Sequence, residues 1–315
     1  RSVYPNGYTY TTGDIRMTTL KTHAESSRTA LGYPPEWVAG LVQRIGEEVP
    51  FGPSLELTSV DVERLLKCVG LWKSERLLAI TTPSPVEGRF TRLTRSLVRR
   101  WFASLRVGVG IRPFEFVEWS LNDYDEMPTD VVEWVGPQSR EQRMETVGEI
   151  AAIIARVAQQ LGYPQLPSGV VLSPEMSVRI DDLTLTARDV DLIIGAGETR
   201  DGIYWPGAVL VGFVHDTPTA EDLDRLAYSS FIYSLRYGGP PARVVSYGLV
   251  SGKSLSMDVE RDWVEMAVGG ILAVLPKLVE LMNGADGVLT PGDHCEGCPD
   301  RGNCPFTLPD SMRDW

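Results

Sequence analysis

Apolar residues recur every three or four positions through much of the first half of the chain, which is the period of an amphipathic helix. One predicted helix begins at Thr58 or Ser59, whose side chains can cap it, and has Cys68 near its end. We therefore expect residues 17–165 to form a mainly helical region that carries Cys68. The apolar face of this helix would consist of Val62, Leu65, Leu66 and Val69.

Two longer helices are predicted in the same region. One covers residues 88–106 and is rich in arginine. The other begins at Ser139, where Gln142 three residues later completes a capping box. Its apolar face would contain Met144, Val147, Ile150, Ile154, Val157 and Leu161.

The pattern changes beyond residue 165. Short runs rich in Val, Ile and Leu, separated by turn residues, predict strands between residues 170 and 250. Two helices are predicted here as well, one in the run TAEDLDRLAYSSFIYSLRY and one over about residues 258–283. The order strand, strand, helix, strand is typical of an α/β core. We therefore expect residues 166–315 to form an α/β core, with a short mixed sheet flanked by helices.

Length and composition narrow the possible functions. The chain has 315 residues, 43% of them hydrophobic, which is enough to bury one large core or two smaller ones. No apolar run reaches the roughly 18 residues that a membrane-spanning helix needs. Residues 1–16 precede Met17 and lack the apolar centre of a signal peptide, so we set them aside as a leader or as appended residues. Acidic residues outnumber basic ones by 42 to 30, which argues against coating nucleic acid by overall charge.

Three of the four cysteines cluster near the end of the chain, in the run HCEGCPDRGNCPF. Without secretory features, clustered thiols bind metals more often than they form disulfides, so we expect a cytoplasmic protein with no membrane partner. A Cys-x2-Cys-x5-Cys pattern can direct three thiolates at one metal centre. Three interpretations stay open: small buried residues without a metal, a zinc ion held by these cysteines and His294, or a four-thiolate site completed by Cys68.

The two cysteine segments also carry a resemblance to a known family. TSVDVERLLKCVGLW and the later HCEGCPDRGNCPF look like the two halves of the iron–sulfur motif in RecB-like nucleases of the PD-(D/E)XK superfamily. Members with this motif include AddB-type helicase–nuclease subunits and cluster-bearing CRISPR-associated exonucleases. The likeness covers residues 55–306 and implies a restriction-endonuclease-like core with a 4Fe–4S cluster that clasps the two ends of the chain. The cluster ligands that it implies are Cys68, Cys295, Cys298 and Cys304.

The same resemblance implies a site for Mg²⁺ or Mn²⁺, built from carboxylates with a lysine beside them. Asp191, in the run LTARDVDLIIG, is the better match to the first acid, and Asp189 is its neighbour. The alternative interpretation of Asp191 is an aspartate at a strand end, exposed to solvent.

The other positions of this implied site have lost their chemistry. Gly212 stands where the family has its second acid, Val214 where it has the lysine, and Ala152 where a helical histidine belongs. Of the family's Gln-x3-Tyr pair, only Tyr228 remains. No lysine occurs in residues 74–252. We therefore expect a nuclease-like fold with a degenerate active site.

The arginines of residues 88–106 are the candidate contacts to nucleic acid, since guanidinium groups bind phosphates and aromatic rings stack on bases. In the alternative interpretation, they form the solvated face of a helix that packs through its leucines and Val98. The candidate arginines are Arg92, Arg95, Arg99 and Arg100, with Trp101 and Phe102 beside them.

We therefore expect an iron–sulfur protein with a nuclease-like fold and no catalysis. It would bind nucleic acid, or serve as a structural subunit, beside a protein partner in a DNA-processing or defence complex. One alternative is an active Mg²⁺- or Mn²⁺-dependent DNA exonuclease or endonuclease with an atypical site around Asp191. Another is a zinc-stabilised protein–protein scaffold that does not bind nucleic acid, for which Trp134, Trp205 and Trp263 offer aromatic surface.

Overall fold

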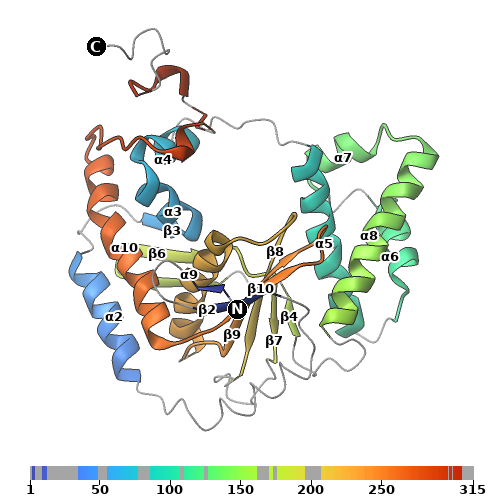
Figure 1. Cartoon of the computed structure of the whole chain (residues 1–315), viewed down its shortest axis with the longest axis horizontal. Coiled ribbons are helices and arrows are strands. Elements are labelled where there is room, and N and C mark those ends of the chain that lie inside the picture. The colour runs from blue at the N-terminus through green and yellow to red at the C-terminus, as the bar shows by residue number, and fades with distance from the viewer. Residues whose placement is uncertain are drawn as a thin grey trace.

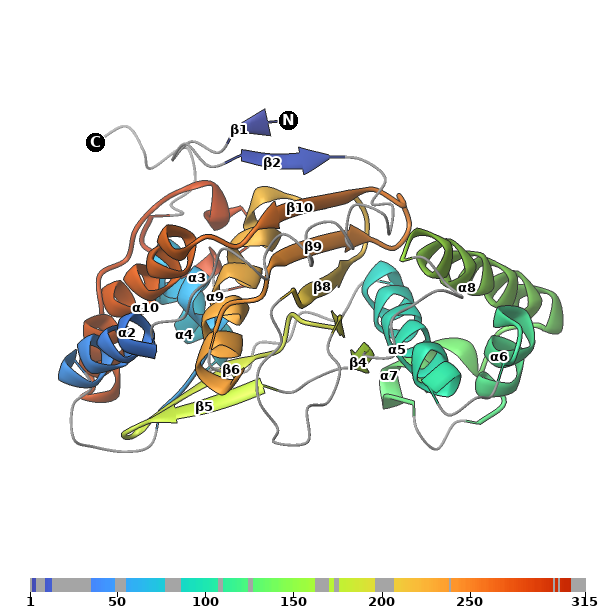
Figure 2. The same ribbon diagram turned by 90° about the horizontal axis from the view of Figure 1, so that it is seen from below.

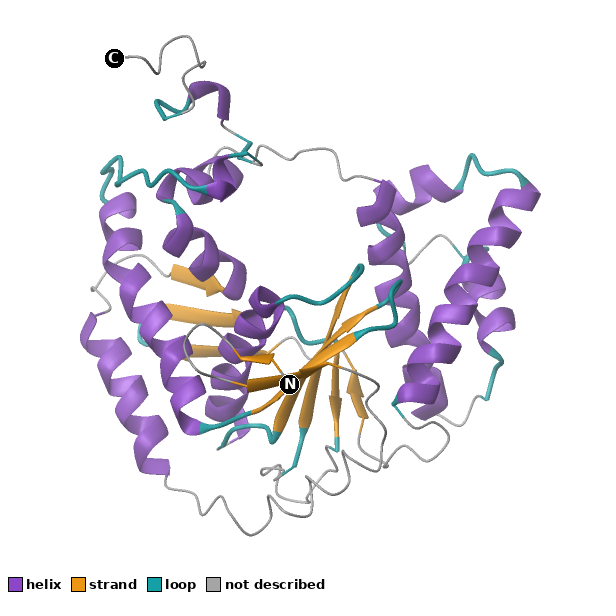
Figure 3. Cartoon of the chain, viewed as in Figure 1, coloured by secondary structure: helices purple, strands orange, loops and turns teal. Residues whose placement is uncertain are grey.

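Helices and strands form a mixed α/β structure in the computed structural model of the chain (Figure 1; Figure 3). It describes residues 2–3, 9–12, 35–48, 55–76, 86–106, 110–123, 127–161, 170–172, 176–195, 207–237, 239–296, 298–299 and 301–306. The helices are α2 (Pro35–Glu48), α3 (Ser59–Lys67), α4 (Val69–Arg76), α5 (Val86–Arg106), α6 (Pro113–Ser120), α7 (Thr129–Val135), α8 (Arg140–Gln160), α9 (Ala220–Tyr237) and α10 (Arg261–Met282). The strands are β1 (Ser2–Val3), β2 (Thr9–Thr12), β3 (Leu55–Thr58), β4 (Val170–Leu172), β5 (Met176–Ile180), β6 (Leu183–Ala187), β7 (Leu192–Ile194), β8 (Val209–Val214), β9 (Arg243–Gly248) and β10 (Ser254–Asp258).

The strands form two mixed sheets. In the larger sheet the order is β1-β2-β10-β9-β8-β7-β4, and only β8 and β9 are parallel neighbours among these described strands. The smaller sheet has the order β3-β6-β5, with β3 parallel and β5 antiparallel to β6. The chain crosses from β8 to β9 through α9, as a parallel pair requires. The expected α/β class, with mixed sheets flanked by helices, is therefore confirmed.

Two helix starts agree with the capping residues in the sequence. Thr58, at the end of β3, caps α3: its backbone N–H and hydroxyl both donate to the Asp61 carboxylate, at 2.9 and 2.6 Å, and the Asp61 N–H returns a bond to the hydroxyl. Ser139 and Gln142 form the expected capping box at the start of α8. Helix α3 ends at Lys67, so Cys68 lies in extended backbone between α3 and α4.

Helices cover both faces of the larger sheet, because consecutive residues along its central strands, which point to opposite faces, are buried. In β8, Leu210 belongs to a core cluster shared with α2, α3, α9 and α10, and Val211 to one shared with α5–α8. In β9, Val244 belongs to the first of these clusters and Val245 to the second. Figure 2 shows α5–α8 gathered at one end of the molecule, away from α9 and α10. Both clusters contain residues from before and after residue 165.

Some expectations differ from the structure. The strand β3 was not predicted, because its four residues are too few to show a strand period. Residues 9–12, set aside with the leader, form β2 and pair with β10. Met144 was placed on the apolar face of its helix but is 38% exposed. Among the described helices, none combines the length and apolar character needed to cross a membrane.

Candidate metal centre and the Asp191 site

All four cysteines line one cavity of about 80 Å³, between the α3–α4 junction and the end of the chain. None of the four forms a disulfide in the structure. The side chain of Cys68 is buried, and the other three are half-buried. The cavity is thus closed on the Cys68 side and nearer to solvent on the C-terminal side. Its walls also include Gly70, Leu289, His294 and Phe306.

Ordinary protein contacts hold the C-terminal segment against α4. A side chain at Gly70 would place its Cβ 2.7 Å from Leu289 Cδ2, and one at Gly287 would lie 2.5 Å from Val69 Cγ1. Gly287 also has a φ of +72°, which favours glycine. In addition, Lys73 Nζ donates to the carbonyl oxygen of residue 286, at 3.2 Å. These contacts hold the two cysteine segments side by side.

Successive tight turns point the three C-terminal thiols to one side. The turns are the 3₁₀ helices η1 (Asp293–Cys295) and η2 (Arg301–Asn303). The Cys298 N–H donates to the Cys295 carbonyl at 3.4 Å. The Gly292 N–H lies 3.4 Å from Cys295 Sγ, and His294 Nε2 lies 3.8 Å from the same sulfur.

The donor set of four thiols is one that a four-iron cluster and a zinc ion both accept. Within the described residues, no three His, Cys, Asp or Glu side chains are close enough together to hold one metal ion. A four-iron cluster lies between its thiolates and needs them further apart than one ion does. The four thiols line one cavity, and His294 lines it as well.

Asp191 is fully buried, so the interpretation of an exposed strand-end aspartate is wrong. It directly precedes β7, and three donors surround its carboxylate. Arg95 Nε lies 2.5 Å and Arg99 Nε 3.4 Å from Oδ1, and the Phe213 N–H donates to Oδ2 at 2.7 Å. Burial raises the pKa of Asp191, and the two arginines and the Phe213 N–H oppose that shift.

Arg95 and Arg99 belong to a polar stripe of α5 that faces the start of β7 and the end of β8. Thr91, one turn before Arg95, has its Oγ1 2.5 Å from His215 Nδ1. Arg95 also donates through Nη2 to the Arg188 carbonyl, at 3.2 Å. Residues four apart share one face of a helix, so this face of α5 closes over the Asp191 end of the sheet.

The arginines named as candidate nucleic-acid contacts do not act as one group. Arg95 and Arg99 face Asp191, whereas Arg92 pairs with Asp130 of α7. Arg100 is half-buried. Trp101 and Phe102 are 2% and 3% exposed, so the expectation that they stack on bases is wrong. The alternative packing of this helix through Leu93, Leu97 and Val98 is confirmed, since all three are buried.

Gly212 has no room for the acid that the family pattern would place there. Its Cβ would lie 2.7 Å from the Asp189 carbonyl oxygen and 3.3 Å from Leu226 Cδ2. The first of these contacts is with backbone and cannot be relieved by rotating a side chain. A side chain at position 212 would therefore require the backbone around it to shift.

Asp189 and Tyr228 are also engaged within the protein. The Ser59 hydroxyl donates to the Asp189 carboxylate, and burial raises the pKa of Asp189 despite that bond. The Tyr228 hydroxyl donates to the Leu57 carbonyl, and burial raises the pKa of Tyr228 well above its ordinary value. Neither side chain has a hydrogen bond to Asp191 among the described interactions, although Arg95, which binds Asp191, also interacts electrostatically with Asp189.

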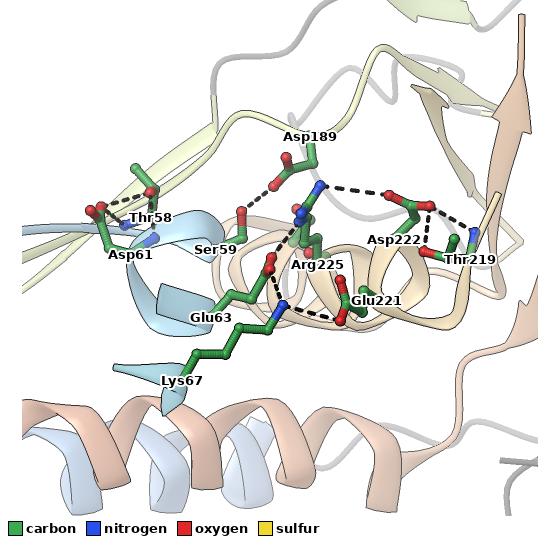
Figure 4. A network of polar contacts seen from close by, with 11 residues as sticks. Thr58, Ser59, Asp61, Glu63, Lys67, Asp189, Thr219, Glu221, Asp222 and Arg225 are labelled. Carbon is green, nitrogen blue, oxygen red and sulfur yellow. Dashed lines mark hydrogen bonds and ion pairs between the residues drawn. The ribbon is translucent and has the colours of Figure 1, made fainter. Parts of the chain in front are cut away.

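A polar network lies between α3 and α9, beside Asp189 (Figure 4). Glu63 accepts from Arg225 Nε at 2.7 Å and from Lys67 Nζ at 2.8 Å, and Lys67 also reaches Glu221 at 3.0 Å. Burial raises the pKa of Glu63, but these hydrogen bonds outweigh it and hold that pKa below its ordinary value. The charges of this network are thus satisfied by one another.

The network borders an apolar groove of about 520 Å³ between α3, α9 and α10, which sequence reasoning missed. Leu66 was assigned to the apolar face of its helix, yet it is 47% exposed here. Small residues on α9 and α10 leave the space open. Overall composition does not reveal that these small residues face one another. The apolar lining includes Val62, Leu66, Ala227, Met266, Ala267 and Gly270.

The candidate interface tryptophans differ in exposure. Trp263 is 1% exposed and belongs to the core, and Trp134 packs edge-on against Phe90, with 6.4 Å between ring centroids. Trp205 lies outside the described residues. The sequence thus indicated the convergence of the cysteines, but it did not indicate the burial of Asp191 or its arginine partners. No family model matches this chain, and no curated protein matches its sequence.

Proposed function

We propose that this chain is an iron–sulfur protein with a PD-(D/E)XK nuclease-like α/β core that has lost catalysis. It acts as a nucleic-acid-binding or structural subunit of a DNA-processing or defence complex, in which a protein partner supplies the chemistry. The observation that carries this proposal is the convergence of Cys68 with the three C-terminal cysteines on one cavity. Segments so distant in the chain have no other evident reason to present four thiols to the same space.

A 4Fe–4S cluster bound by these cysteines would serve as a structural cross-link. Cys68 would hold it at the α3–α4 junction, and Cys295, Cys298 and Cys304 would hold it at the end of the chain. Cys68 is the buried anchor, and the glycine contacts at Gly70 and Gly287 allow the close approach. The role of these residues is to join the two ends of the described core.

The state of the acidic residues supports the loss of catalysis. Metal-dependent hydrolysis needs carboxylates with oxygens available to Mg²⁺ or Mn²⁺. Both oxygens of Asp191 already accept hydrogen bonds, and the Gly212 position has no space for a second acid. These contacts argue against the alternative of an active nuclease centred on Asp191.

One observation favours the alternative of a protein–protein scaffold. The groove between α3, α9 and α10 is apolar and leaves Leu66 47% exposed, as a surface that receives a partner's side chain would. A partner bound there and nucleic acid bound at α5 would occupy different faces. The two functions are therefore compatible, and the scaffold alternative stands alone only if the chain does not bind nucleic acid.

The proposal is tested by measuring iron, zinc and acid-labile sulfide per chain after anaerobic purification of the wild type and Cys68→Ser. We expect about four irons with matching sulfide in the wild type, depleted in the variant. Zinc at about one per chain, indifferent to Cys68, would overturn the cluster and support the local zinc site.

The nucleic-acid part is tested separately, by fluorescence anisotropy with labelled oligonucleotides. We expect binding at low salt that weakens steeply as salt rises, because phosphate contacts release counterions. An absence of binding at low salt would contradict this part and leave the scaffold function.

A further inference from the structure

The groove between α3, α9 and α10 is lined by one face of each of these three helices. On α3 the lining positions follow the helical period along the whole helix. Nine residues at about 1.5 Å each make this face about 13.5 Å long, which is between two and three turns. The groove, of about 520 Å³, therefore has the length of a short helical segment. The lining residues of α3 are Ser59, Val62, Glu63, Leu66 and Lys67.

Small residues let another backbone come close to the groove. Ala227 on α9 is 1% exposed and lies deep in it. At Gly270 on α10, a Cβ would lie 3.5 Å from Val62 Cγ1 and 3.7 Å from Leu66 Cδ1, so α10 and α3 already touch at this point. Leu66 nevertheless stays 47% exposed at the edge of the groove. A shallow apolar surface of this kind suits the apolar face of a helix, whose side chains insert at i, i+4 and i+7.

The ion-paired network along one side of the groove carries more negative than positive charge (Figure 4). Three acids share two bases, so the network has a net charge of about one negative unit. Asp189 also interacts with Arg225 and adds a further acid to the same side. Asp224 lines the groove as well, but it has contacts of its own and is not needed for this balance. The five members counted are Glu63, Lys67, Glu221, Asp222 and Arg225.

The charge is confined to one side of the groove and reaches solvent there. Glu221 is the most exposed of the five, at 58%, whereas Lys67 and Arg225 are 34% and 32% exposed. The opposite wall is uncharged, because the described residues of α10 that line it are Met266, Ala267 and Gly270. A partner that is complementary to both walls is apolar toward α10 and basic toward α9.

We propose that this groove binds an amphipathic helix of a partner protein, with apolar residues at i, i+4 and i+7 and with Lys or Arg on the side that faces α9. The inference rests on the proposed function for the existence of a partner, and it specifies the surface and the chemistry of that partner. Binding at this groove is separate from the cysteine cavity, since Leu66 lines the first and Cys68 the second.

The test selects binders from a phage-displayed library of helical peptides on the immobilised full chain, with Leu66→Glu as the counter-selection target. We expect the enriched peptides to share the apolar period and a net positive charge. Their Kd, measured by fluorescence anisotropy, should weaken about 30-fold in Leu66→Glu, which places a carboxylate on the apolar edge. The matched control is Met282→Glu, since Met282 is 48% exposed on α10 but does not line the groove, and it should leave the Kd unchanged.

A second pair of variants tests the charge. Glu221→Lys reverses the most exposed charge of the network and should weaken an enriched peptide about fivefold, with a smaller effect at high salt. Asp262→Lys changes an exposed acid of α10 outside the lining and should leave the Kd unchanged. Equal effects at the two positions would show attraction by overall charge and would reject the complementarity of this groove.

Other results would also overturn the inference. These are enrichment of acidic peptides, the absence of any enriched peptide, and peptides that bind Leu66→Glu as tightly as the wild type. A wild-type dimer that Leu66→Glu dissociates, seen by analytical ultracentrifugation, would assign the groove to a second copy of the chain. Thermal melts report whether each variant is folded, and the Glu221→Lys comparison still decides if Leu66→Glu is not.

Iron and acid-labile sulfide, measured on the same preparation, report on the proposed function separately. A chain that holds the cluster but enriches no groove-dependent peptide would overturn the inference alone. A chain without the cluster that binds such peptides through Leu66 would overturn the iron–sulfur function and leave the helix-binding groove in place.

Discussion

The cysteine cavity and the Asp191 site both bring together residues that are distant in the chain, but they treat their polar groups in opposite ways. At the cavity, four thiols face a space of about 80 Å³ that the protein leaves open. At Asp191, two arginines and a backbone N–H occupy the carboxylate, and the backbone closes on Gly212. The first site leaves its thiols around open space, and the second surrounds its carboxylate with donors from the polypeptide.

Solvation chemistry explains the difference. A buried carboxylate without a compensating charge is very costly, so a site that lacks its metal must supply cations from side chains. A thiol is a small and weakly polar group, and it can line a half-buried cavity at little cost. Loss of metal chemistry at Asp191 would therefore remodel its surroundings, whereas the thiols impose no such demand.

The largest effect is expected from a substitution that removes one thiol from the cysteine cavity. If the proposed cluster is bound, Cys68→Ser should destabilise the protein by about 2–5 kcal/mol, comparable to losing a disulfide, because the cluster would no longer link the α3–α4 junction to the C-terminal segment. Urea denaturation of anaerobically purified protein measures the change, and hydrogen exchange should locate new opening in residues 285–306. Ser74→Ala, buried on α4 but outside the cavity lining, is the matched control. Equal losses in both variants would show that the effect is local packing.

The next effect tests whether the Asp191 site is structural. Asp191→Asn should destabilise by about 2 kcal/mol, below the 3–5 kcal/mol of a wholly buried pair because the guanidinium groups reach solvent. Asp130→Asn removes the partner of Arg92 in an exposed pair and should cost less than about 1 kcal/mol. Denaturation midpoints at neutral pH compare them. A similar cost at both positions would contradict the buried role of Asp191.

A third effect concerns the space at Gly212. Gly212→Ala should destabilise by about 1–3 kcal/mol, because its Cβ meets the Asp189 carbonyl at 2.7 Å and the backbone must shift. Gly148→Ala, inside α8 with no atom within 4 Å of its Cβ, should instead stabilise by about 0.5–1 kcal/mol. Thermal melts of the two variants should therefore move in opposite directions. A tolerated Gly212→Ala would show that the second acid's position remains open.

The sequence predicted those features that local chemistry determines. Thr58 and Ser139 cap helices because their side chains satisfy nearby N–H groups, and this depends on only four consecutive residues. Leu93 and Leu97 are buried because the helical period places them on one face. The convergence of the cysteines on one cavity agrees with the spacing pattern, while the cluster itself remains a prediction.

The features that the sequence did not reveal depend on distant neighbours. The period of α5 separates apolar from polar faces, but it does not say that the polar face meets Asp191 nearly a hundred residues later. The same period left Trp101 and Phe102 as candidates for stacking, although both are core residues. Leu66 shows the reverse error, since an apolar face can border a groove as well as a core.

The smallest expected effect is the contribution of Asp189 to the pH dependence of stability. Because burial raises the pKa of Asp189, the folded protein retains that proton to a higher pH than the unfolded chain does. The unfolded state therefore binds fewer protons in the range above the ordinary aspartate pKa, and this group makes stability fall as pH rises through it. Asp189→Asn should remove that fall, so its stability relative to the wild type should increase from about pH 4 to about pH 7. Urea midpoints across this range measure it, with the exposed Asp262→Asn as control, and a constant difference would contradict the burial of Asp189.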